Sequence, residues 1–455
     1  MSVVPPGRIQ ALNDRPPAKG RYVLYWMQQS QRVPMNHALA FAVEAANERR
    51  LPLLVVFGLT ADYPEANRRH YAFMLEGLQE TQRALTDRKI RMIVRRGSPP
   101  AVALEAAADA AVVICDRGAM PHQKAWRRQV AERCPCRVLQ VESDVVVPLA
   151  ETSPKAEYAA RTIRPRIHRH LERCLEAFRM PAVKVPSLTI ADDGLRVDDL
   201  AAVLDALGVD GAVPPVTRFF SGGTAPAMAR LDRFIENQLT TYHTDRNPPE
   251  KDVGSHLSPY LHFGQISPIT MALRVQSAQA PPEAAAAFIE ELVVRRELAF
   301  NFVNYTAGFD RYESLPEWAR RTLAEHRSDP RPHVYDAARL EAADTHDPYW
   351  NAAMDEMRIT GYMHNYMRMY WGKKVLEWSE TPEAAFDTLL RLNNRYFLDG
   401  RDPNAYAGVG WIFGIHDRAW PARAIYGKVR SMMASGLERK FDIGKYVDRI
   451  AALKA

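Results

Sequence analysis

Four tryptophans, Trp350, Trp371, Trp378 and Trp411, fall within one stretch of the sequence, residues 348–411, that is also rich in methionine and other aromatic residues. Trp371 and Trp378 are seven residues apart, so on a helix both side chains lie on one face, two turns from each other. Together with Trp350 they can form a stack of rings through the protein. An ordinary helical core rarely needs this combination, and we therefore interpret the stretch as functional.

Polar groups in the same stretch favour the binding of a planar organic group. Arg368 can pair with Asp399 or with Asp402, and a paired guanidinium in aromatic surroundings can lie against a heterocycle. Trp411, which follows a glycine-rich turn, can stack on an extruded base, as any exposed indole can. The sequence shows no Ser-His-Asp arrangement and no set of metal ligands, so we expect an organic cofactor and no metal site.

A charged helical motif permits two interpretations. Glu290, Glu291, Arg295 and Arg296 have the spacing of a solvated helix face with salt bridges, which is the commoner case. The functional alternative makes Glu291 a buried carboxylate that hydrogen-bonds a substrate.

A second motif, which begins near residue 242, is also open to two interpretations. Ser255 and Ser258 precede an apolar, helix-like run. They can cap a helix and direct its free backbone N–H groups at an anion such as a diphosphate, or they can be ordinary N-caps with no ligand.

The composition is that of an ordinary globular protein of 455 residues, with 47% hydrophobic and 25% charged residues. No run of about 18 apolar residues occurs, and residues 1–20 are polar and Pro-rich, so we expect a cytoplasmic protein without membrane association. Four cysteines in so long a chain argue against a disulfide framework. The net charge of +6 permits an anionic partner without requiring one.

The first part of the chain alternates apolar, strand-like runs with segments of helical period. The expected strands are Tyr22–Trp26, Leu53–Phe57, Ile90–Val94, Ala111–Cys115 and Arg137–Val141, and the expected helices are Asn36–Arg49, Asn67–Leu85, Pro100–Ala108 and Gln123–Arg133. This order predicts a doubly wound α/β domain with a parallel sheet over residues 21–150, after a flexible amino terminus at residues 1–20. No standard glycine loop for phosphate follows the first strand.

The remainder of the chain is predicted to be helical. Residues 151–225 form a Pro-interrupted linker that contains one helix, Tyr158–Phe178. Residues 226–455 show helical period throughout, which predicts an all-α domain. Its expected helices are Met228–Leu239, Ile269–Gln276, Glu283–Tyr305, Pro316–His326, Ala337–Ala342, Tyr349–Met357, Met363–Glu377, Pro382–Asn394 and Arg423–Ser435.

Strings in both halves of the chain carry a resemblance to a known family. They are Tyr25–Arg32, Leu257–Gln265, Glu291–Glu297, Tyr366–Trp371 and Leu398–Asn404. Together they closely resemble the photolyase and cryptochrome flavoproteins, and within them the class II cyclobutane pyrimidine dimer (CPD) DNA photolyases. The resemblance implies an amino-terminal antenna domain and a carboxyl-terminal catalytic domain that binds U-shaped FAD, active as FADH⁻.

The resemblance also implies where the cofactor lies. The residues at the positions of flavin-phosphate and ribityl contacts are Tyr242, Arg246, Gly254, Ser255, His256, Leu257 and Ser258. Arg368 with Asp399 is similar to the pair beside the isoalloxazine ring, and Asn393 is similar to the side chain that faces its N5. The class II electron-transfer chain that photoreduces FAD is matched by Trp371, Trp350 and Trp378.

On the substrate side, the resemblance implies light-dependent DNA repair by a carbon–carbon lyase. Glu291, Met369 and Trp411 match the pocket for the dimer, and Arg430 matches a DNA contact near the lesion. Light-excited FADH⁻ would give an electron to a flipped-out cis-syn dimer, the cyclobutane bonds would open, and the electron would return. Glu291, protonated or sharing a proton, would stabilise the dimer radical anion.

The implied partner is UV-damaged DNA, double- or single-stranded, bound without reading its sequence. Basic residues near the pocket would hold its phosphates; they are Arg423, Lys428, Arg430, Arg439 and Lys440. We expect a monomer with no obligatory protein partner.

One departure and several alternatives accompany this interpretation. The more widely known photolyase class carries Trp three residues after the pocket Glu, where this chain has Val294, which fits class II. A cryptochrome-like photoreceptor without repair activity shares the fold and the flavin. A 6-4 photoproduct enzyme would show His in the pocket, and a plain nucleotide-binding α/β protein would bind no flavin. The antenna chromophore stays open among a deazaflavin, a folate, another flavin and none.

Overall fold

A computed structural model describes residues 2–191 and 193–454 of the chain. Packing divides the chain into two compact units. The first contains the residues up to Pro154, Ile167–Leu231 and Leu257–Ser277, and the second contains Lys155–Arg166, Asp232–His256 and the residues from Ala278 onward. Because the chain passes between the units more than once, neither unit is one contiguous segment of the sequence.

The first unit is built on a parallel sheet that is extended by one antiparallel edge strand. In the described residues its strands are β1 (Ile9–Ala11), β2 (Tyr22–Trp26), β3 (Leu53–Leu59), β4 (Arg91–Arg96), β5 (Ala110–Asp116) and β6 (Arg137–Val141), in the order β1-β6-β5-β2-β3-β4. The strands from β2 to β6 pair in parallel, and β1 pairs antiparallel with β6. The five predicted strands and the predicted α/β fold are confirmed.

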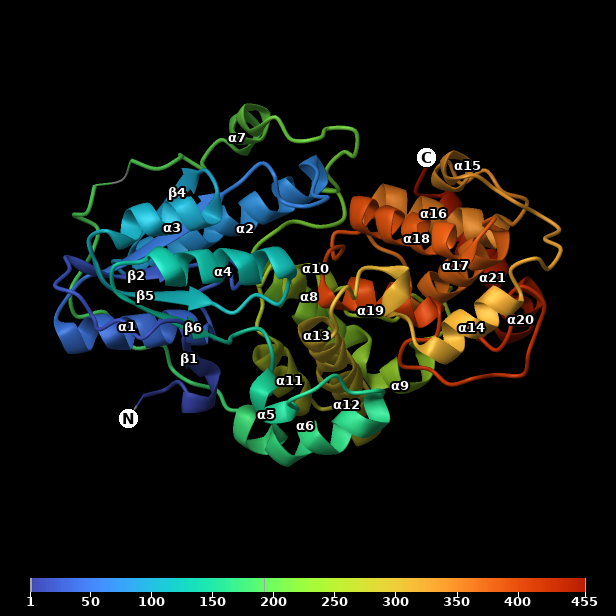
Figure 1. The fold of residues 1–455 in the computed structure, drawn as a ribbon, viewed down its shortest axis with the longest axis horizontal. Helices are drawn as coiled ribbons and strands as arrows, with labels where there is room; N and C mark the ends of the chain where they lie inside the picture. Colours follow the sequence, from blue (N-terminus) through green and yellow to red (C-terminus); the bar gives the residue numbers. More distant parts are fainter. Residues whose placement is uncertain (1, 192, 455) are drawn as a thin grey trace. The chain divides into compact units, whose positions relative to one another are not determined.

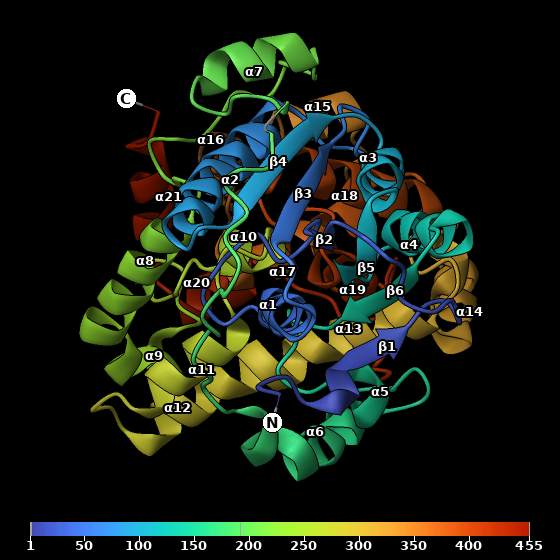
Figure 2. The same cartoon turned by 90° about the vertical axis from the view of Figure 1, so that its left-hand side faces the viewer.

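Helices cover both faces of this sheet. α1 (His37–Arg49) and α2 (Arg68–Asp87) pack on the face that contains Val23 and Tyr25 of β2. α3 (Pro99–Ala107) and α4 (Pro121–Arg133) pack on the face that contains Leu24 and Trp26. Figures 1 and 2 show α1 and α3 on opposite sides of the strands. Because successive residues of a strand point to opposite faces and both faces are covered, the strand is apolar throughout.

The amino terminus differs from the flexible segment expected at residues 1–20. Ile9–Ala11 forms β1, and the buried guanidinium of Arg8 donates hydrogen bonds to the carbonyl oxygens of Glu142, Val145 and Val146 at 3.2, 3.0 and 2.6 Å. A three-residue strand is too short to show a period, and arginine is almost never fully buried without partners that only the folded chain supplies.

The described chain after residue 142 contains helices and connecting loops, without a further strand. The helices before residue 277 are α5 (Leu149–Thr152), α6 (Ala160–Cys174), α7 (Leu200–Leu207), α8 (Thr224–Asn237), α9 (Tyr242–Asp245), α10 (Ser258–His262) and α11 (Pro268–Gln276). Those after it are α12 (Pro282–Ile289), α13 (Arg296–Tyr305), α14 (Glu317–Glu325), α15 (Ala337–Glu341), α16 (Pro348–Thr360), α17 (Asn365–Trp378), α18 (Pro382–Tyr396), α19 (Pro403–Ile412), α20 (Ala434–Lys440) and α21 (Ile443–Ala451). The predicted all-α carboxyl half is confirmed.

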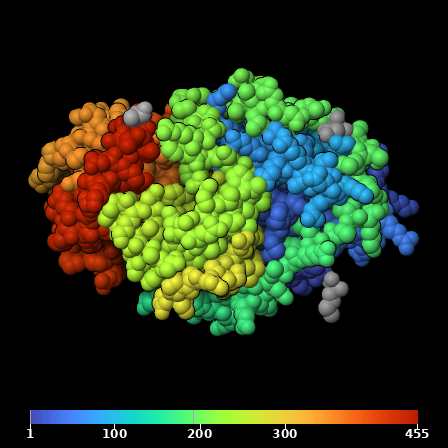
Figure 3. Space-filling view, turned by 180° about the vertical axis from the view of Figure 1, so that it is seen from behind, coloured from blue at the N-terminus to red at the C-terminus, as the bar shows by residue number. Residues whose placement is uncertain are grey.

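Four helices of the second unit, α16 to α19, pack against one another in sequence and carry most of the predicted site residues. Asp347 caps α16 by accepting from the N–H groups of Tyr349 and Trp350, and Gly361 ends it with a φ of +73°. Asp402 caps α19, which begins at Pro403. α21 packs against α16, and in Figure 3 the red carboxyl-terminal part of the chain lies beside an orange part of the same unit.

The predicted helix Glu283–Tyr305 is continuous, but its middle is not a regular α-helix. Between α12 and α13, residues Glu290–Arg295 form a π-helical turn. Such turns insert one residue into a helix and are frequent at functional sites. The turn changes the direction of the side chains that follow it, and the helical period of the sequence does not reveal such a turn.

The predicted helix Arg423–Ser435 is wrong over most of its length. Residues 423–433 form a loop in which Arg423 makes an isolated antiparallel bridge to Gly427, and Ile425 and Gly427 have φ values of +70° and +53°. The loop is tied to α14, because the N–H of Lys428 donates to Thr322 Oγ1 at 3.0 Å. Left-handed backbone cannot continue an α-helix, so α20 begins only at Ala434.

Candidate functional site

Arg368, on α17, pairs with Asp399 in the loop that follows α18. Its Nη2 lies 3.1 Å from both carboxylate oxygens, and both side chains are largely buried. The guanidinium lies over the Phe397 ring, 3.8 Å from its centroid, and its Nε donates to the carbonyl oxygen of Met363. Of the two partners predicted for Arg368, the structure selects Asp399, since Asp402 caps α19.

Asn393 lies one turn before the end of α18 and is buried. Its side-chain N–H donates to Asn394 Oδ1 at 3.0 Å, and the same oxygen accepts from the backbone N–H of Arg401 at 2.9 Å. This network fixes the orientation of the Asn393 amide on the helix that precedes Asp399.

The structure brings the three predicted tryptophans into contact. The indole N–H of Trp350 donates to the carbonyl oxygen of Trp371 at 3.0 Å, and the ring centroids of Trp350 and Trp378 are 5.7 Å apart. Trp371 also meets Phe397 edge to face at 6.3 Å. All three indoles are at most 3% exposed. A path of contacts therefore runs from Phe397, beside Arg368, to Trp371 by ring contact, from the Trp371 carbonyl to the Trp350 indole by a hydrogen bond, and on to Trp378 by ring contact.

The outer end of this path is at Trp378. Its ring meets Tyr335 at 5.5 Å and His346 at 5.1 Å, and the Tyr335 hydroxyl is 2.7 Å from His346 Nδ1. His333 stacks on His346 with centroids 3.7 Å apart, and both imidazoles belong to exposed residues. The sequence could not order the three tryptophans, because that order depends on how α16 and α17 cross.

Glu291 is not the buried carboxylate that the functional interpretation predicted. Its side chain is 38% exposed and its Oε1 lies 2.6 Å from Nη1 of Arg246. Its neighbour Glu290 makes the ordinary helix-face pairs, with Arg164 at 2.7 Å and Arg295 at 3.0 Å. Successive residues of a helix point in different directions, so that Glu290 faces other charges of the helix surface and Glu291 faces Arg246, in the loop after α9.

Arg246 and Tyr242 lie together at the α9 turn, next to Glu291. The Arg246 guanidinium is 5.7 Å from the centroid of the Tyr242 ring, which packs on Phe288 at 5.6 Å. Burial and the nearby Glu291 carboxylate raise the pKa of Tyr242 to about 12, so its hydroxyl stays protonated at neutral pH. Residues implied for the cofactor and for the lesion thus meet at this corner.

The segment that begins at Gly254 contains strained backbone. His256 has a φ of +51°, stacks on Tyr362 at 4.4 Å, and has its Nε2 3.2 Å from Asp252. A Cβ added at Gly254 would lie 3.2 Å from the His256 ring, which favours glycine there. Ser258 is the first residue of α10 and not its N-cap; that position belongs to Leu257, and no side chain caps the helix, so the predicted serine cap is wrong.

Trp411, on α19, lies between cations. Nζ of Lys373 is 4.8 Å from its ring centroid, and the guanidinium of Arg430 is 5.6 Å away. Arg430 also pairs with Asp417 at 2.9 Å and stacks on Trp420 at 4.0 Å, and Arg418 lies over Trp420 at 4.7 Å. No sequence motif distinguishes Lys373, Trp420 or Arg418, although tryptophan and basic residues recur closely between residues 411 and 430.

The remaining predicted residues are placed as follows. Met369 follows Arg368 on α17 and is partly buried. Of the basic residues expected around the pocket, Arg430 is ion-paired with Asp417 and Lys440 donates to the Tyr366 hydroxyl at 3.2 Å, both within the second unit.

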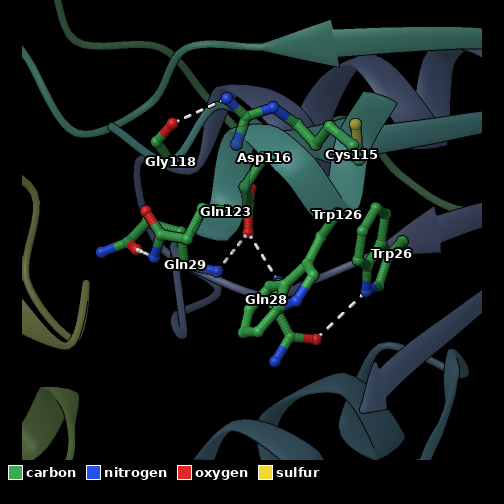
Figure 4. A pocket seen from close by; sticks show the side chains of 9 residues that line it. Trp26, Gln28, Gln29, Cys115, Asp116, Gly118, Gln123 and Trp126 are labelled. Carbon is green, nitrogen blue, oxygen red and sulfur yellow. Dashed lines mark hydrogen bonds between the residues drawn. The ribbon is translucent and has the colours of Figure 1, made fainter. Parts of the chain in front are cut away.

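A small pocket of the first unit lies at the carboxyl ends of β2 and β5 (Figure 4). Asp116 accepts from the backbone N–H groups of Gln28 and Gln29 at 3.0 and 2.8 Å, and the Trp26 indole donates to Gln28 Oε1 at 3.1 Å. Trp126 completes the aromatic lining. The carboxyl ends of parallel strands are where such sheets bind ligands, but the enclosed space of about 10 Å³ holds little more than one water molecule.

The described residues contain no group of His, Cys, Asp and Glu side chains arranged to hold a metal ion. Among their helices, none combines the length and the apolar composition that crossing a bilayer requires.

Comparisons with known proteins agree with this geometry. A family model described as DNA photolyase matches residues 23–184. The chain is 50% identical over 447 residues to the deoxyribodipyrimidine photo-lyase of Methanothermobacter thermautotrophicus, covering 98% of each chain. It is 39% identical over 434 residues to that of Potorous tridactylus, covering 94% of this chain and 81% of the relative. A class III photolyase structure from Agrobacterium tumefaciens has a TM-score of 0.72 at 18% identity, covering 96% of this chain and 87% of that one, which shows the fold alone.

Proposed function

The chain belongs to the DNA photolyase family, and from that membership and its site we propose that it repairs DNA in a light-dependent reaction. Its activity is that of a deoxyribodipyrimidine photo-lyase, which splits a flipped-out cis-syn cyclobutane pyrimidine dimer into two pyrimidines. The observation that carries this proposal is the path of buried contacts from Phe397 through Trp371 and Trp350 to Trp378, in which Trp350 is hydrogen-bonded to the Trp371 carbonyl oxygen. Repair of this kind needs a cofactor kept in its reduced state, and closely placed indoles can pass single electrons to it.

The residues around Arg368 fit a bound FAD. The flat guanidinium is held in place by Asp399, and two buried donors, Nε of Arg246 and Nε1 of Trp371, have no partner among the described groups. When bound as FADH⁻ and excited by light, the cofactor supplies the electron that opens the dimer and takes it back afterwards. Arg368 and Asp399 would lie beside the isoalloxazine ring, and Asn393 would face its N5.

The phosphate and ribityl portions of FAD would be held at the α9 corner and by the segment that follows it. Tyr242 and Arg246 supply a hydroxyl that stays protonated and a cation, and the segment Gly254–Ser258 supplies backbone N–H groups. Glycine at position 254 lets the backbone approach a ligand closely.

The tryptophan line maintains the reduced cofactor. Trp371 is next to Phe397 and Arg368 and is therefore the inner residue, Trp350 is central, and Trp378 is the outer residue. An external thiol reductant would resupply electrons at the Trp378 end, where exposed imidazoles lie.

The lesion would be held by Glu291, Met369 and Trp411. A carboxylate and a pyrimidine carbonyl are both acceptors, so Glu291 can donate to a carbonyl of the dimer only when it carries a proton, whereas the ionised carboxylate can accept from an N3–H of the dimer. Arg246, 2.6 Å from Glu291, can donate to that carbonyl instead and stabilise the negative charge that develops on it. Trp411 and Met369 would contact the flipped bases, and Arg430 would contact a phosphate.

The finer assignments rest on the sequence. Val294, three residues after Glu291, supports class II. The partner would be damaged double- or single-stranded DNA, the protein would act as a cytoplasmic monomer, and the pocket in Figure 4 would open to take an antenna chromophore, a deazaflavin, a folate or a flavin.

The absorption spectrum of the purified protein tests this proposal. It is recorded before and after blue illumination with a thiol reductant, and UV-damaged oligothymidine is then added. We expect a bound flavin that bleaches to the reduced form and a return of absorbance at 260 nm that needs light. A flavin that bleaches while the lesion persists would identify a cryptochrome-like photoreceptor. Folded protein without flavin would overturn the assignment of the helical half.

A further inference from the structure

Lys373 is a fully buried lysine in the helical unit. It lies on α17 with 0% of its surface exposed, although lysine is almost never fully buried unless it is paired. Its Nζ donates to the carbonyl oxygen of Ile412, at the end of α19, at 2.5 Å. The last carbonyl groups of a helix lack partners within the helix and carry partial negative charge, so this contact satisfies one of them.

The position of the amine is fixed by the close approach of α17 and α19. A Cβ added at Gly372 would come within 2.6 Å of the Ile412 side chain, so the two helices leave no room for a larger neighbour. The Tyr426 hydroxyl donates to the carbonyl oxygen of Lys373 at 2.9 Å, which holds the backbone from the other side. The Lys373 side chain extends toward α19, and its Nζ lies 4.8 Å from the centroid of the Trp411 ring.

The surroundings of Lys373 leave its charge sensitive to a ligand. No carboxylate of the described chain lies within 4.0 Å of its Nζ, whereas its neighbour Lys374 pairs with Glu377 at 2.6 Å. Burial lowers the pKa of Lys373 to about 7; Asp417 acts to raise it and Arg430 acts to lower it. The Tyr426 hydroxyl, which reaches the Lys373 carbonyl oxygen, also lies 2.9 Å from the Glu377 carboxylate, and burial raises the pKa of Tyr426 well above its usual value, so it stays neutral.

We propose that Lys373 is a positioning residue for lesion recognition: it holds Trp411 and the end of α19 in place and takes up a proton when damaged DNA binds. This inference rests on the function proposed above, because it assigns Trp411 to the dimer pocket. The contact between amine and indole is a cation–π interaction, which is stronger when the site is shielded from water. A bound lesion shields the ring, and its phosphates favour the charged amine.

The sign of the expected pH dependence follows from this linkage. Free protein holds the amine half-charged near pH 7, whereas the complex keeps it charged to a higher pH. Binding therefore takes up a proton above pH 7, and each further pH unit weakens binding up to about tenfold. Below pH 6 both states are protonated and the affinity is constant.

The test measures dark binding of a dimer-containing oligonucleotide between pH 6 and pH 9 by fluorescence anisotropy. The undamaged oligonucleotide of the same length corrects for general DNA affinity. We expect the ratio of the two affinities to fall about tenfold between pH 6 and pH 8 for the natural protein. Lys373→Met should give a lower and flat ratio, and Lys374→Met, the matched control on the same helix, should keep the slope of the natural protein.

Calorimetry of the natural protein in two buffers of different ionisation enthalpy gives a readout that does not depend on a variant's folding. It should show uptake of up to one proton per complex at pH 8. Selective binding that is flat with pH and takes up no proton would overturn the role of Lys373, as would Lys373→Met that folds and keeps the slope. A natural protein that does not prefer damaged DNA at any pH would instead contradict the proposed function.

Discussion

Trp350, Trp371 and Trp378 on one hand, and Trp411 on the other, lie in the same helical unit but differ in the charges near their rings. In the described chain no lysine or arginine lies over the rings of Trp350 and Trp371, and the cation near Trp378 is Lys374, which Glu377 neutralises. Trp411, in contrast, has the amine of Lys373 4.8 Å from its ring centroid, and no carboxylate of the described chain pairs with that amine; the second cation near the ring, Arg430, is paired with Asp417. A cation beside an indole disfavours its oxidation, because the oxidised ring would be a like charge.

This difference assigns the two groups to different tasks although the side chains are identical. The line from Trp371 to Trp378 can lose electrons, since it is dry and free of uncompensated positive charge. Trp411 is protected from oxidation and electron-rich enough to attract cations, so it is suited to stacking against a base. Under the proposed function, charge placement, and not residue type, separates electron transfer from recognition. Four experiments test this difference between the tryptophans.

Trp371→Phe should have the largest effect, because it removes the inner tryptophan of the line from Trp371 to Trp378 and leaves Trp411 intact. Photoreduction of the bound flavin by a thiol should be nearly abolished, since phenylalanine is much harder to oxidise than tryptophan. The rate of flavin bleaching measures this, and dimer binding in the dark serves as the control. Unchanged bleaching would mean that electrons reach the flavin by another route.

Acidification should lower the stability of α17, the helix that carries both Trp371 and the Lys373 side chain that contacts Trp411. His364 caps this helix, and burial lowers its pKa to about 4 from 6.5. Because the folded pKa is the lower one, the unfolded chain binds the proton first, so stability is complete above pH 6.5 and is lost as pH falls toward 4. The full loss is about 3 kcal/mol.

Denaturant unfolding at pH 7.5 and at pH 4.5 measures this loss. Asp252, His256 and Arg449 also act on the His364 pKa, so the variant His364→Asn, which keeps an N-cap acceptor without a titrating ring, isolates the imidazole. The variant should lose less stability on acidification than the natural protein. Equal losses would show that the imidazole is not responsible.

Trp411→Ala should weaken recognition and spare electron transfer. Loss of one stacked base costs about 1–3 kcal/mol, so the affinity for a dimer-containing oligonucleotide should fall about 5- to 150-fold. Anisotropy titration gives the affinity, and the bleaching rate of the flavin should match that of the natural protein. If bleaching slowed as well, the separation between the two groups of tryptophans would not hold.

Arg430→Met should have the smallest effect and should act on general DNA affinity. Loss of one phosphate contact lowers the slope of log affinity against log salt by about 1, for damaged and undamaged DNA alike. Binding titrations at several salt concentrations give this slope. A loss confined to damaged DNA would place Arg430 in the dimer pocket and not at a phosphate.

Much of the fold could be predicted from the sequence, because its signals are local. The strands from Tyr22–Trp26 to Arg137–Val141 are short apolar runs bounded by turns, and their buried faces require that pattern. β1 and α19 were not predicted, because their local sequence signals are weak. β1 has only three residues, and α19 contains Gly408 and Gly410, which lower helix propensity, so its stability comes from its Asp402 cap and its neighbours.

The residue types of the site were also determined by the sequence alone: indoles at helical spacing, one arginine with nearby aspartates, and the strings shared with the family. The tertiary structure alone decided how these residues are connected. It chose Asp399 over Asp402 as the partner of Arg368, ordered the tryptophans, and paired Glu291 with Arg246. It also placed Lys373 beneath Trp411. Local patterns report burial and period, whereas charge pairing and ring contacts depend on residues far apart in the chain that only packing brings together.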